Sequence, residues 1–196
     1  QAGRVITVLP GAWLFAPEKF RAEAETAAPG AATCFAGKTA DQIPMLFARF
    51  DGIVAIVALG IVVRLIAPYL RDKAHDPGIV VLDEGGRFAI PVLSGHIGGA
   101  NALAALLAER IGATPVFTTA SDSRGTLAVD LLGREFGWRI EAPKDNVTRA
   151  SAAVVNDEPV ALVQEAGTRH WWTRAAPLPA NLRICATLED IDPATF

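Results

Sequence analysis

Short, continuously apolar runs alternate with amphipathic stretches along the first two thirds of the chain. Continuous apolar runs are typical of strands that are buried on both faces, whereas apolar residues spaced three and four apart are typical of helices. The pattern predicts strands at 4–10, 32–35, 51–59 and 114–119, and helices at 17–28, 39–50, 62–70, 100–112 and 126–137. Alternating strands and helices predict an α/β fold, with a mostly parallel sheet that is flanked by helices.

Two further patterns complete the predicted organisation. Residues 78–93, GIVVLDEGGRFAIPVL, predict a β-hairpin, because two β-branched runs flank Glu84-Gly85-Gly86. After Trp138 the pattern changes to a short helix capped by Asp145 or Asn146, then a strand at 158–167 and an aromatic, proline-rich stretch. We therefore expect an α/β domain over residues 1–142 and a smaller α/β segment over residues 143–196.

Composition narrows the class of protein. The 18 Lys and Arg residues are outnumbered by 21 Asp and Glu residues, so no basic surface indicates nucleic acid as a partner. The longest apolar run ends at Arg64 and is too short to cross a membrane. Cys34 and Cys185 form no CxxC motif, which is typical of buried free thiols in a cytoplasmic protein, and His75 has no partner at metal-ligand spacing. We expect a cytoplasmic protein without a metal site.

Three loops follow predicted strands, at 59–64, 94–101 and 118–126, and ligands of α/β proteins bind beyond the carboxyl ends of strands. In SGHIGGAN, residues 94–101, Ser94 and His96 stand among glycines directly before a predicted helix. Glycines allow a ligand to approach the backbone, and free N–H groups at a helix start bind anions. The loop therefore predicts an anion or substrate site. The alternative is a tight turn in which His96 is hydrogen-bonded locally.

Other candidate residues have both structural and functional interpretations. Asp83 stands at a strand end, and Asp122 is expected to cap the helix that follows it or to orient a base. Arg64, on an otherwise apolar helix, needs a carboxylate from the protein or from a ligand. The charge-dense residues 71–77 predict a solvated turn, and His170-Trp171-Trp172 predicts a small satellite core or a contact surface.

Residues 58–122 resemble the cobalamin biosynthesis protein CbiG family. The resemblance rests on the GIVVR turn, the DK..DP segment, the DE.GRF hairpin, the SGH.GGAN loop and the TTA.D loop. Residues 145–167 are similar to the central region of that family. The family commonly carries a C-terminal domain as well, for which this sequence shows no counterpart.

The resemblance implies a cobalt-precorrin-5A hydrolase of anaerobic cobalamin biosynthesis, which opens a δ-lactone on a cobalt corrinoid and releases acetaldehyde. Cobalt belongs to the substrate, so no cofactor is expected. On this chemistry His96 or Asp122 acts as general base, and the backbone N–H groups of Gly98 to Ala100 stabilise the oxyanion. Arg71 and Arg87 are further candidates for holding substrate carboxylates. The predicted substrate-binding residues are Arg64, Lys73, Asp83, Ser94, Gly95, Gly98, Gly99, Asn101 and Thr119.

Two other hypotheses stay open at this point. The chain is a non-catalytic corrinoid- or anion-binding module that needs a separate C-terminal partner, or an α/β esterase with Ser94 as nucleophile. The second is disfavoured because the sequence has no GxSxG motif. An acidic chain with an irregular aromatic segment allows a homodimer or a partner chain without requiring either.

Overall fold

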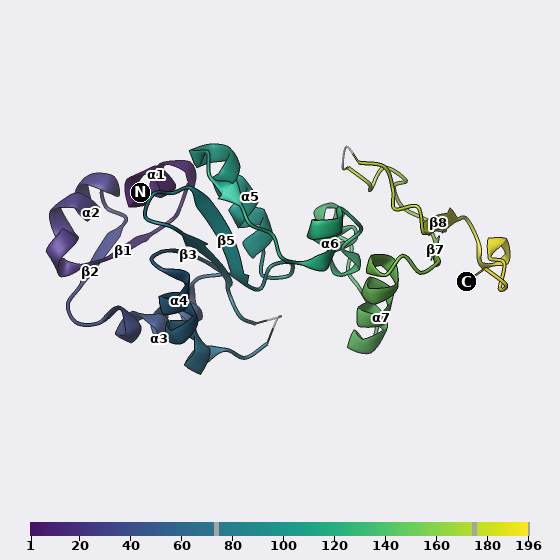
Figure 1. The fold of residues 1–196 in the computed structure, drawn as a ribbon, viewed down its shortest axis with the longest axis horizontal. Coiled ribbons are helices and arrows are strands. Elements are labelled where there is room, and N and C mark those ends of the chain that lie inside the picture. The colour runs from purple at the N-terminus through teal and green to yellow at the C-terminus, as the bar shows by residue number, and fades with distance from the viewer. Residues whose placement is uncertain (73–74, 174–175, 196) are drawn as a thin grey trace. The chain divides into compact units, whose positions relative to one another are not determined.

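The computed structural model describes residues 1–72, 75–173 and 176–195 of the chain. The chain forms two compact units, Gln1–Phe117 and Thr118–Phe196 (Figure 1). The predicted boundary between residues 142 and 143 lies inside the second unit, because residues 118–142 group with the residues that follow them.

The first unit contains two sheets and the helices that cover them. Its elements are α1 (Ala2–Val8), β1 (Leu14–Pro17), η1 (Glu18–Phe20), α2 (Arg21–Ala27), β2 (Ala32–Phe35), η2 (Thr39–Gln42), α3 (Ile43–Arg49), β3 (Gly52–Ile56), α4 (Leu59–Ile66), η3 (Ala67–Tyr69), β4 (Gly78–Leu82), β5 (Phe88–Leu93), α5 (Ala100–Ile111) and β6 (Thr114–Pro115). The central sheet has the order β3-β4-β5-β6, and β1 pairs with β2 in a sheet of their own. Every pairing is parallel except the β4–β5 hairpin, which confirms the predicted fold class.

Helices cover both faces of the central sheet (Figure 1). On one face, Val80 and Leu82 of β4 pack with Leu107 of α5. On the other face, Ile79 and Val81 of the same strand pack with Val62 and Ile66 of α4. All five residues of β4 are buried, as the continuously apolar run predicts for a central strand.

The strand predicted at residues 4–10 is wrong, because residues 2–8 form α1. Val5, Val8 and Leu9 pack against the cluster of α5, and their spacing of three and four residues is that of one helical face. The β-branched residues of RVITVLP suggested a strand, but the packing of this face against the cluster of α5 favours a helix. The strand that the prediction missed is β1, just after this helix.

The second unit is built from shorter elements. These are α6 (Ala120–Arg124), η4 (Val129–Leu131), η5 (Arg134–Phe136), α7 (Lys144–Val155), β7 (Val160–Val163), β8 (Leu182–Cys185) and η6 (Leu188–Asp190). β7 and β8 form a two-stranded parallel sheet. Its core gathers Leu127, Val154, Trp171 and Leu182, and the indole N–H of Trp171 donates to the Gln164 side-chain oxygen over 2.9 Å. Trp171 therefore belongs to a small core, as the sequence predicted.

The helix predicted at residues 126–137 is also wrong. The segment forms two short 3-10 turns, and Gly133 between them has a φ of 71°. A Cβ at Gly133 would overlap the ring of Trp138, so the chain turns at this glycine to admit the indole. The expected cap of α7 is wrong too, because Pro143 holds the N-cap position and Asp145 lies in the first turn. A carboxylate in a first turn still favours the helix dipole.

Among the residues that the structure describes, no helix is long and apolar enough to cross a membrane.

Candidate active site: the loop between β5 and α5

The SGHIGGAN loop joins β5 to α5 and is held by its own backbone. The N–H of Ala100 donates to the Ser94 carbonyl over 3.2 Å, and the N–H of Asn101 donates to the Gly95 carbonyl over 2.9 Å. Inside this frame the N–H of Gly99 donates to the His96 carbonyl over 3.0 Å. Ser94 adopts a φ of 52°, which is unusual for a residue other than glycine. The loop is therefore a defined turn that fixes the backbone of His96.

The glycines of the loop serve its own packing. A Cβ at Gly98 would overlap the Cβ of Ser94, and one at Gly95 would lie 2.7 Å from the side-chain oxygen of Asn101. Gly99 has open space around it, but its φ of 79° lies in the left-handed region that favours glycine. Asn101 itself is buried at the start of α5. The loop is thus tightly packed without any ligand.

The backbone donors that the sequence assigned to an oxyanion are partly engaged. The N–H groups of Gly99 and Ala100 donate to carbonyls of the same loop. The glycine-rich sequence before a helix suggested that the N–H groups of Gly98, Gly99 and Ala100 are free. The turn that leads into α5 engages two of these three groups, those of Gly99 and Ala100. An anion at this helix start would have to compete with the Ser94 and His96 carbonyls for the N–H groups of Ala100 and Gly99.

His96 and Ser94 are the two residues of the loop with side chains that could take part in chemistry. His96 is half-buried and Ile97 is 43 % exposed, so the tip of the loop presents an imidazole beside an apolar side chain. The Ser94 hydroxyl oxygen is buried and has no hydrogen-bond partner among the described residues. A buried unsatisfied hydroxyl costs free energy, and a ligand could satisfy this one only after a movement of the loop that exposes it.

The hairpin places the predicted loops at different edges of the central sheet. β5 runs antiparallel to β4, with Leu93 beside Ile79 and Ala89 beside Leu82. The carboxyl end of β5, and with it His96, therefore lies at the edge where β3 and β4 begin. A Cβ at Gly78, the first residue of β4, would overlap the Gly98 carbonyl oxygen. Asp83 follows the carboxyl end of β4, so the structure does not bring it together with His96, whereas the segment 59–64, predicted as a loop, lies within α4.

Asp83 stabilises the hairpin turn. Its carboxylate accepts the backbone N–H groups of Arg87 over 2.7 Å and Phe88 over 2.8 Å, and it pairs with the Arg87 side chain over 3.2 Å. The hydrogen bond from Phe88, followed by those from Arg87, lowers the pKa of the Asp83 carboxyl group from its ordinary value. These hydrogen bonds of the carboxylate all go to residues of the hairpin turn, so its role there is structural.

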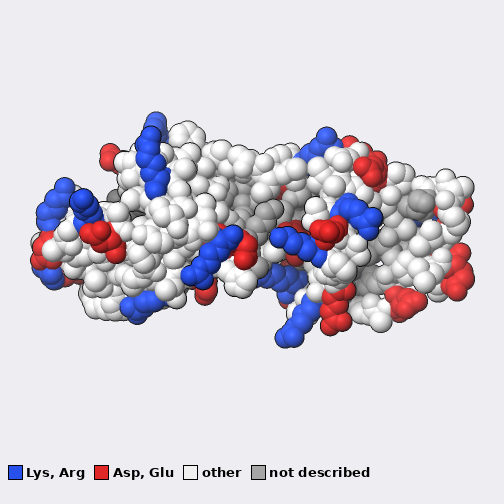
Figure 2. Space-filling model, turned by 90° about the horizontal axis from the view of Figure 1, so that it is seen from below, with Lys and Arg blue, Asp and Glu red and all other residues white. Residues whose placement is uncertain are grey.

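The basic residues predicted to hold carboxylates have different surroundings. Arg64 is exposed on α4 and makes no hydrogen bond or ion pair with another described residue, so its charge is solvated and requires no protein carboxylate. Lys73 lies outside the described residues. The backbone N–H of Arg71 donates to Asp76, and Arg87 takes part in the hairpin turn. On the face shown in Figure 2, basic and acidic side chains are interspersed.

The charge-dense turn at 71–77 contains a residue that the sequence reasoning passed over. Asp76 is only 7 % exposed, and both of its carboxylate oxygens accept the N–H of Arg71, over 3.0 and 3.1 Å. His75 is exposed and pairs with Asp72 over 2.9 Å. An aspartate directly before a proline was the only available signal for a carboxylate that organises a turn.

Thr119 and Asp122 belong to the second unit. Thr119 is the N-cap residue of α6, and its hydroxyl donates to the Asp122 carboxylate over 2.5 Å. Asp122 lies inside this short helix, so the predicted role as cap of a helix at 126–137 is wrong. Among the described residues, no group of three or more His, Cys, Asp or Glu side chains is arranged to hold a metal ion, and Cys34 and Cys185 are both free thiols.

Comparison with known proteins identifies two consecutive family regions. Residues 41–122 match the family model of the cobalamin synthesis G N-terminal region, and residues 127–194 match the cobalamin biosynthesis central region. The first match ends at Asp122 and includes the whole SGHIGGAN loop.

Relatives with curated names are similar to the same part of the chain. A cobalt-precorrin-5A hydrolase of Priestia megaterium is 48 % identical over 155 residues, which are 79 % of this chain and 41 % of that protein. A cobalt-precorrin-5A hydrolase of Salmonella typhimurium is 38 % identical over 138 residues, which are 70 % of this chain and 37 % of that protein. The chain thus spans about two fifths of the length of the curated relatives it matches.

A solved structure of a cobalamin biosynthesis protein G homologue from Sulfolobus solfataricus is also similar. The two share 23 % sequence identity with a TM-score of 0.47, and the match covers 88 % of this chain and 52 % of that one.

Proposed function

Because the chain belongs to the cobalamin biosynthesis protein G family, whose N-terminal and central regions it carries, we propose that it acts in the hydrolysis of cobalt-precorrin-5A. The observation that carries the proposal is the 48 % identity with a cobalt-precorrin-5A hydrolase over 155 residues. The substrate is accordingly a cobalt corrinoid, and cobalt arrives as part of it rather than as a cofactor of the protein.

The reaction that we assign has two steps, and each needs a proton acceptor. Water adds to the lactone carbonyl carbon, the ring C–O bond breaks, and the ring oxygen leaves as a hydroxyl group. Loss of the proton from that hydroxyl then breaks the carbon–carbon bond to the macrocycle. The two-carbon fragment leaves as acetaldehyde, and the electron pair stays with the electron-poor macrocycle. A general base placed at the lactone serves both steps.

We assign the general base to His96. Its backbone is fixed by the hydrogen bonds of the loop, and its side chain is half-buried rather than enclosed in the core. An unprotonated imidazole is a suitable acceptor for a proton of the attacking water. Asp122 is the second candidate, and its carboxylate already accepts the Thr119 hydroxyl.

The oxyanion needs a donor other than the amides of Gly99 and Ala100, which donate inside the loop. We assign this role to the imidazolium that His96 becomes when it accepts the proton of the attacking water, because a positive charge beside a developing oxyanion stabilises it. The Ser94 hydroxyl has no hydrogen-bond partner among the described residues but is buried, so we assign it to a polar atom of the substrate only in a conformation in which the loop has opened.

We place the protein in the cytoplasm, in keeping with its two free cysteines. A homodimer, or a separate chain that supplies the C-terminal domain, stays a prediction that light scattering of the purified chain tests.

The proposal is tested by acetaldehyde release from cobalt-precorrin-5A, with His96→Ala and Ile97→Ala measured beside the unmodified chain. We expect His96→Ala to lower turnover about 10²- to 10⁴-fold, which is the usual contribution of a general base. Ile97→Ala removes a neighbouring exposed side chain and should change turnover by less than about threefold. Circular dichroism of all three chains checks that the fold is kept.

The possible outcomes distinguish a hydrolase that uses His96 from a hydrolase that uses another base and from a binding module. Release by the unmodified chain that survives in His96→Ala would remove His96 from the chemistry and make Asp122→Asn the next variant. Substrate binding without acetaldehyde release would establish a binding module that depends on a C-terminal partner. No binding would overturn the proposed function for this chain.

A further inference from the structure

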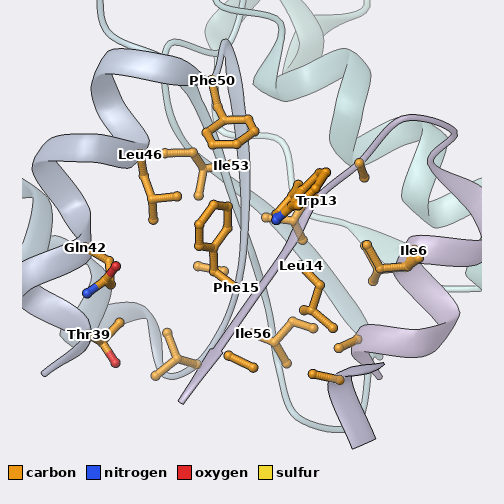
Figure 3. A pocket seen from close by; sticks show the side chains of 18 of the residues that line it. Ile6, Trp13, Leu14, Phe15, Thr39, Gln42, Leu46, Phe50, Ile53 and Ile56 are labelled. Atoms are coloured by element: carbon orange, nitrogen blue, oxygen red, sulfur yellow. The ribbon is translucent and has the colours of Figure 1, made fainter. Parts of the chain in front are cut away.

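A large apolar cavity lies inside the first unit, between its two sheets. It has a volume of about 940 Å³. Figure 3 shows side chains that line it, among them Leu14 and Phe15 of β1, Ile53 and Ile56 of β3, and Phe50. The loop that carries His96 does not line it. The cavity is therefore separate from the candidate active site.

The two strands that border the cavity are both edge strands. β1 is an end strand of its two-stranded sheet, and β3 is an end strand of the central sheet. All four residues of β1 and all five of β3 line the cavity. Each strand therefore has one backbone edge without a strand partner among the described residues, and both edges adjoin the same apolar space. Unpaired N–H and C=O groups on such an edge are a template for another strand.

Helices close the cavity on both faces, as they do around a central strand. α1 and Leu103 of α5 line it on one side, and α3 and α4 line it on the other. The two helix layers also divide the side chains of β3, since Val54 and Ile56 pack with α5 and Ile53 and Ala55 pack with α4. A space between two strand edges and two helix layers has the surroundings of a strand that is buried on both faces.

The volume of the cavity is similar to the volume of a short buried strand. One residue of a buried strand occupies a block of about 160 Å³, from a rise of about 3.3 Å, a strand spacing of about 4.8 Å and a layer distance of about 10 Å. The 940 Å³ of the cavity are thus of the order of the volume of a short strand, and the five residues of β3 that line it indicate a similar length.

The lining also defines the chemistry of the occupant. Among the described residues that line the cavity, only Glu23 carries a charged side chain. A cobalt corrinoid with several carboxylates would be buried there without cations to pair with, which is costly. An uncharged apolar peptide loses no such interaction, and its backbone pairs with both edges.

The position of α1 indicates where the strand would join. The Gln1 side chain lines the cavity and also donates to the Gly85 carbonyl over 2.9 Å, in the turn that follows the carboxyl end of β4. α1 therefore begins at the edge of the sheet where the parallel strands β3 and β4 end. A strand that leads into α1 would run parallel to them, and α1 would be the crossover helix from it to β1.

We propose that the cavity is the place of one further β-strand of about six apolar residues, parallel to β3 and joined to Gln1 by a short turn. It would unite the two sheets in the order β2-β1-new strand-β3-β4-β5-β6. This is the doubly wound arrangement, in which the chain starts in the middle of the sheet and proceeds first to one edge and then to the other. The new strand and β3 would then border the switch point, where such sheets bind ligands.

The test is an extended chain with six β-branched apolar residues and a glycine-containing turn joined ahead of Gln1. The matched control carries an extension of equal length with Ser, Gly and Asp at the strand positions. We expect only the apolar extension to raise the protection of the β1 and β3 amides from hydrogen exchange, by about tenfold or more, and to abolish binding of a hydrophobic dye. Equal protection with both extensions would overturn the proposal.

Two more measurements keep the proposal testable if the apolar extension aggregates. In the unextended chain, alternate amides of Gly52–Ile56 bond to β4 while the others face the cavity, so the second set should exchange about a hundredfold faster. Uniform protection of all five amides in a monomer would mean that the edge is already closed, and would overturn the proposal. Uniform protection in a dimer, detected by light scattering, would assign the space to a second copy instead.

These measurements use no corrinoid and no turnover, so their failure is distinct from a failure of the proposed hydrolase activity.

Discussion

β4 of the first unit and β7 of the second are both short apolar strands in parallel pairs, yet their surroundings differ. Every residue of β4 is buried, between a strand on each side and a helix layer on each face. Every residue of β7 is half-buried, with β8 as its only strand partner in the described chain. The burial of a strand is therefore set by how many layers and strands surround it, and an apolar sequence alone does not guarantee it.

This difference predicts which of the two units has the larger free energy of unfolding. Clusters in the first unit contain fully buried aliphatic side chains on both sheet faces. The cluster of the second unit has four buried residues, of which only Val154 has almost no exposed area, and its other members are half-buried. We expect the first unit to be the more stable, because apolar area removed from water is the main favourable contribution to folding. Paired variants in each region test the comparison.

The largest effect is expected from truncation of a core leucine. Leu107→Ala removes a side chain with no exposed area in the first unit and should cost about 3–5 kcal/mol. Leu182→Ala in the second unit, where the side chain is 8 % exposed and its sheet has two strands, should cost about 2 kcal/mol. Hydrogen exchange of peptides from each unit measures both changes. Equal losses would refute the ranking of the two cores.

A smaller effect is expected in the SGHIGGAN loop. Gly98→Ala places a Cβ against Ser94 and should cost about 2–3 kcal/mol through overpacking. Gly99→Ala meets open space but strains a left-handed backbone, which should cost about 1–2 kcal/mol. Urea unfolding of both variants gives the difference. A Gly98→Ala variant as stable as the unmodified chain would mean that the loop can open.

The hairpin turn should make a contribution that depends on pH. Asp83→Asn removes the charge that accepts the N–H groups of Phe88 and Arg87, and should lower the midpoint of thermal unfolding at pH 7. Because folding lowers the pKa of the Asp83 carboxyl, its stabilisation is complete above the ordinary value near 3.9 and is lost as the pH falls through the lower folded value. Melting curves from pH 7 to pH 2 should therefore converge for the two chains at the acid end, and a constant gap would refute this linkage.

The smallest effect is expected at Arg64. The side chain is exposed and unpaired among described residues, so Arg64→Gln should change the free energy of unfolding by less than about 0.5 kcal/mol. Arg4→Gln is the matched control, because the Arg4 guanidinium donates to the Ile111 carbonyl over 2.6 Å. Thermal melts rank the two. A cost at Arg64 as large as that at Arg4 would contradict its description as a solvated charge.

Much of the first unit could be predicted from local sequence. The buried strand at β4, the hairpin at residues 78–93 and the helix that ends at Gly112 each carry a signal in their own residues: a continuous apolar run, two β-branched runs around glycines, and a glycine at the C-cap. The candidate loop was found for the same reason, because glycines around a histidine before a helix stand out.

Other parts depended on contacts that local sequence does not reveal. Residues 2–8 form α1 because Val5 packs on α5, about a hundred positions along the chain. Residues 126–137 do not form one helix, because the chain turns at Gly133 beside the indole of Trp138. The backbone amides of the loop looked free in the sequence, and their partners are carbonyls of the same turn.

The sequence by itself determined the α/β class, the hairpin and the SGHIGGAN turn, because hydrophobic periodicity and glycine conformation act over a few residues. Only the tertiary structure decided that Asp83 and His96 lie at opposite edges of the sheet, because edge assignment follows from the antiparallel β4–β5 pairing. It alone also decided that β1 and β3 leave a strand-sized apolar space between them, since strand order is set by which elements pack together.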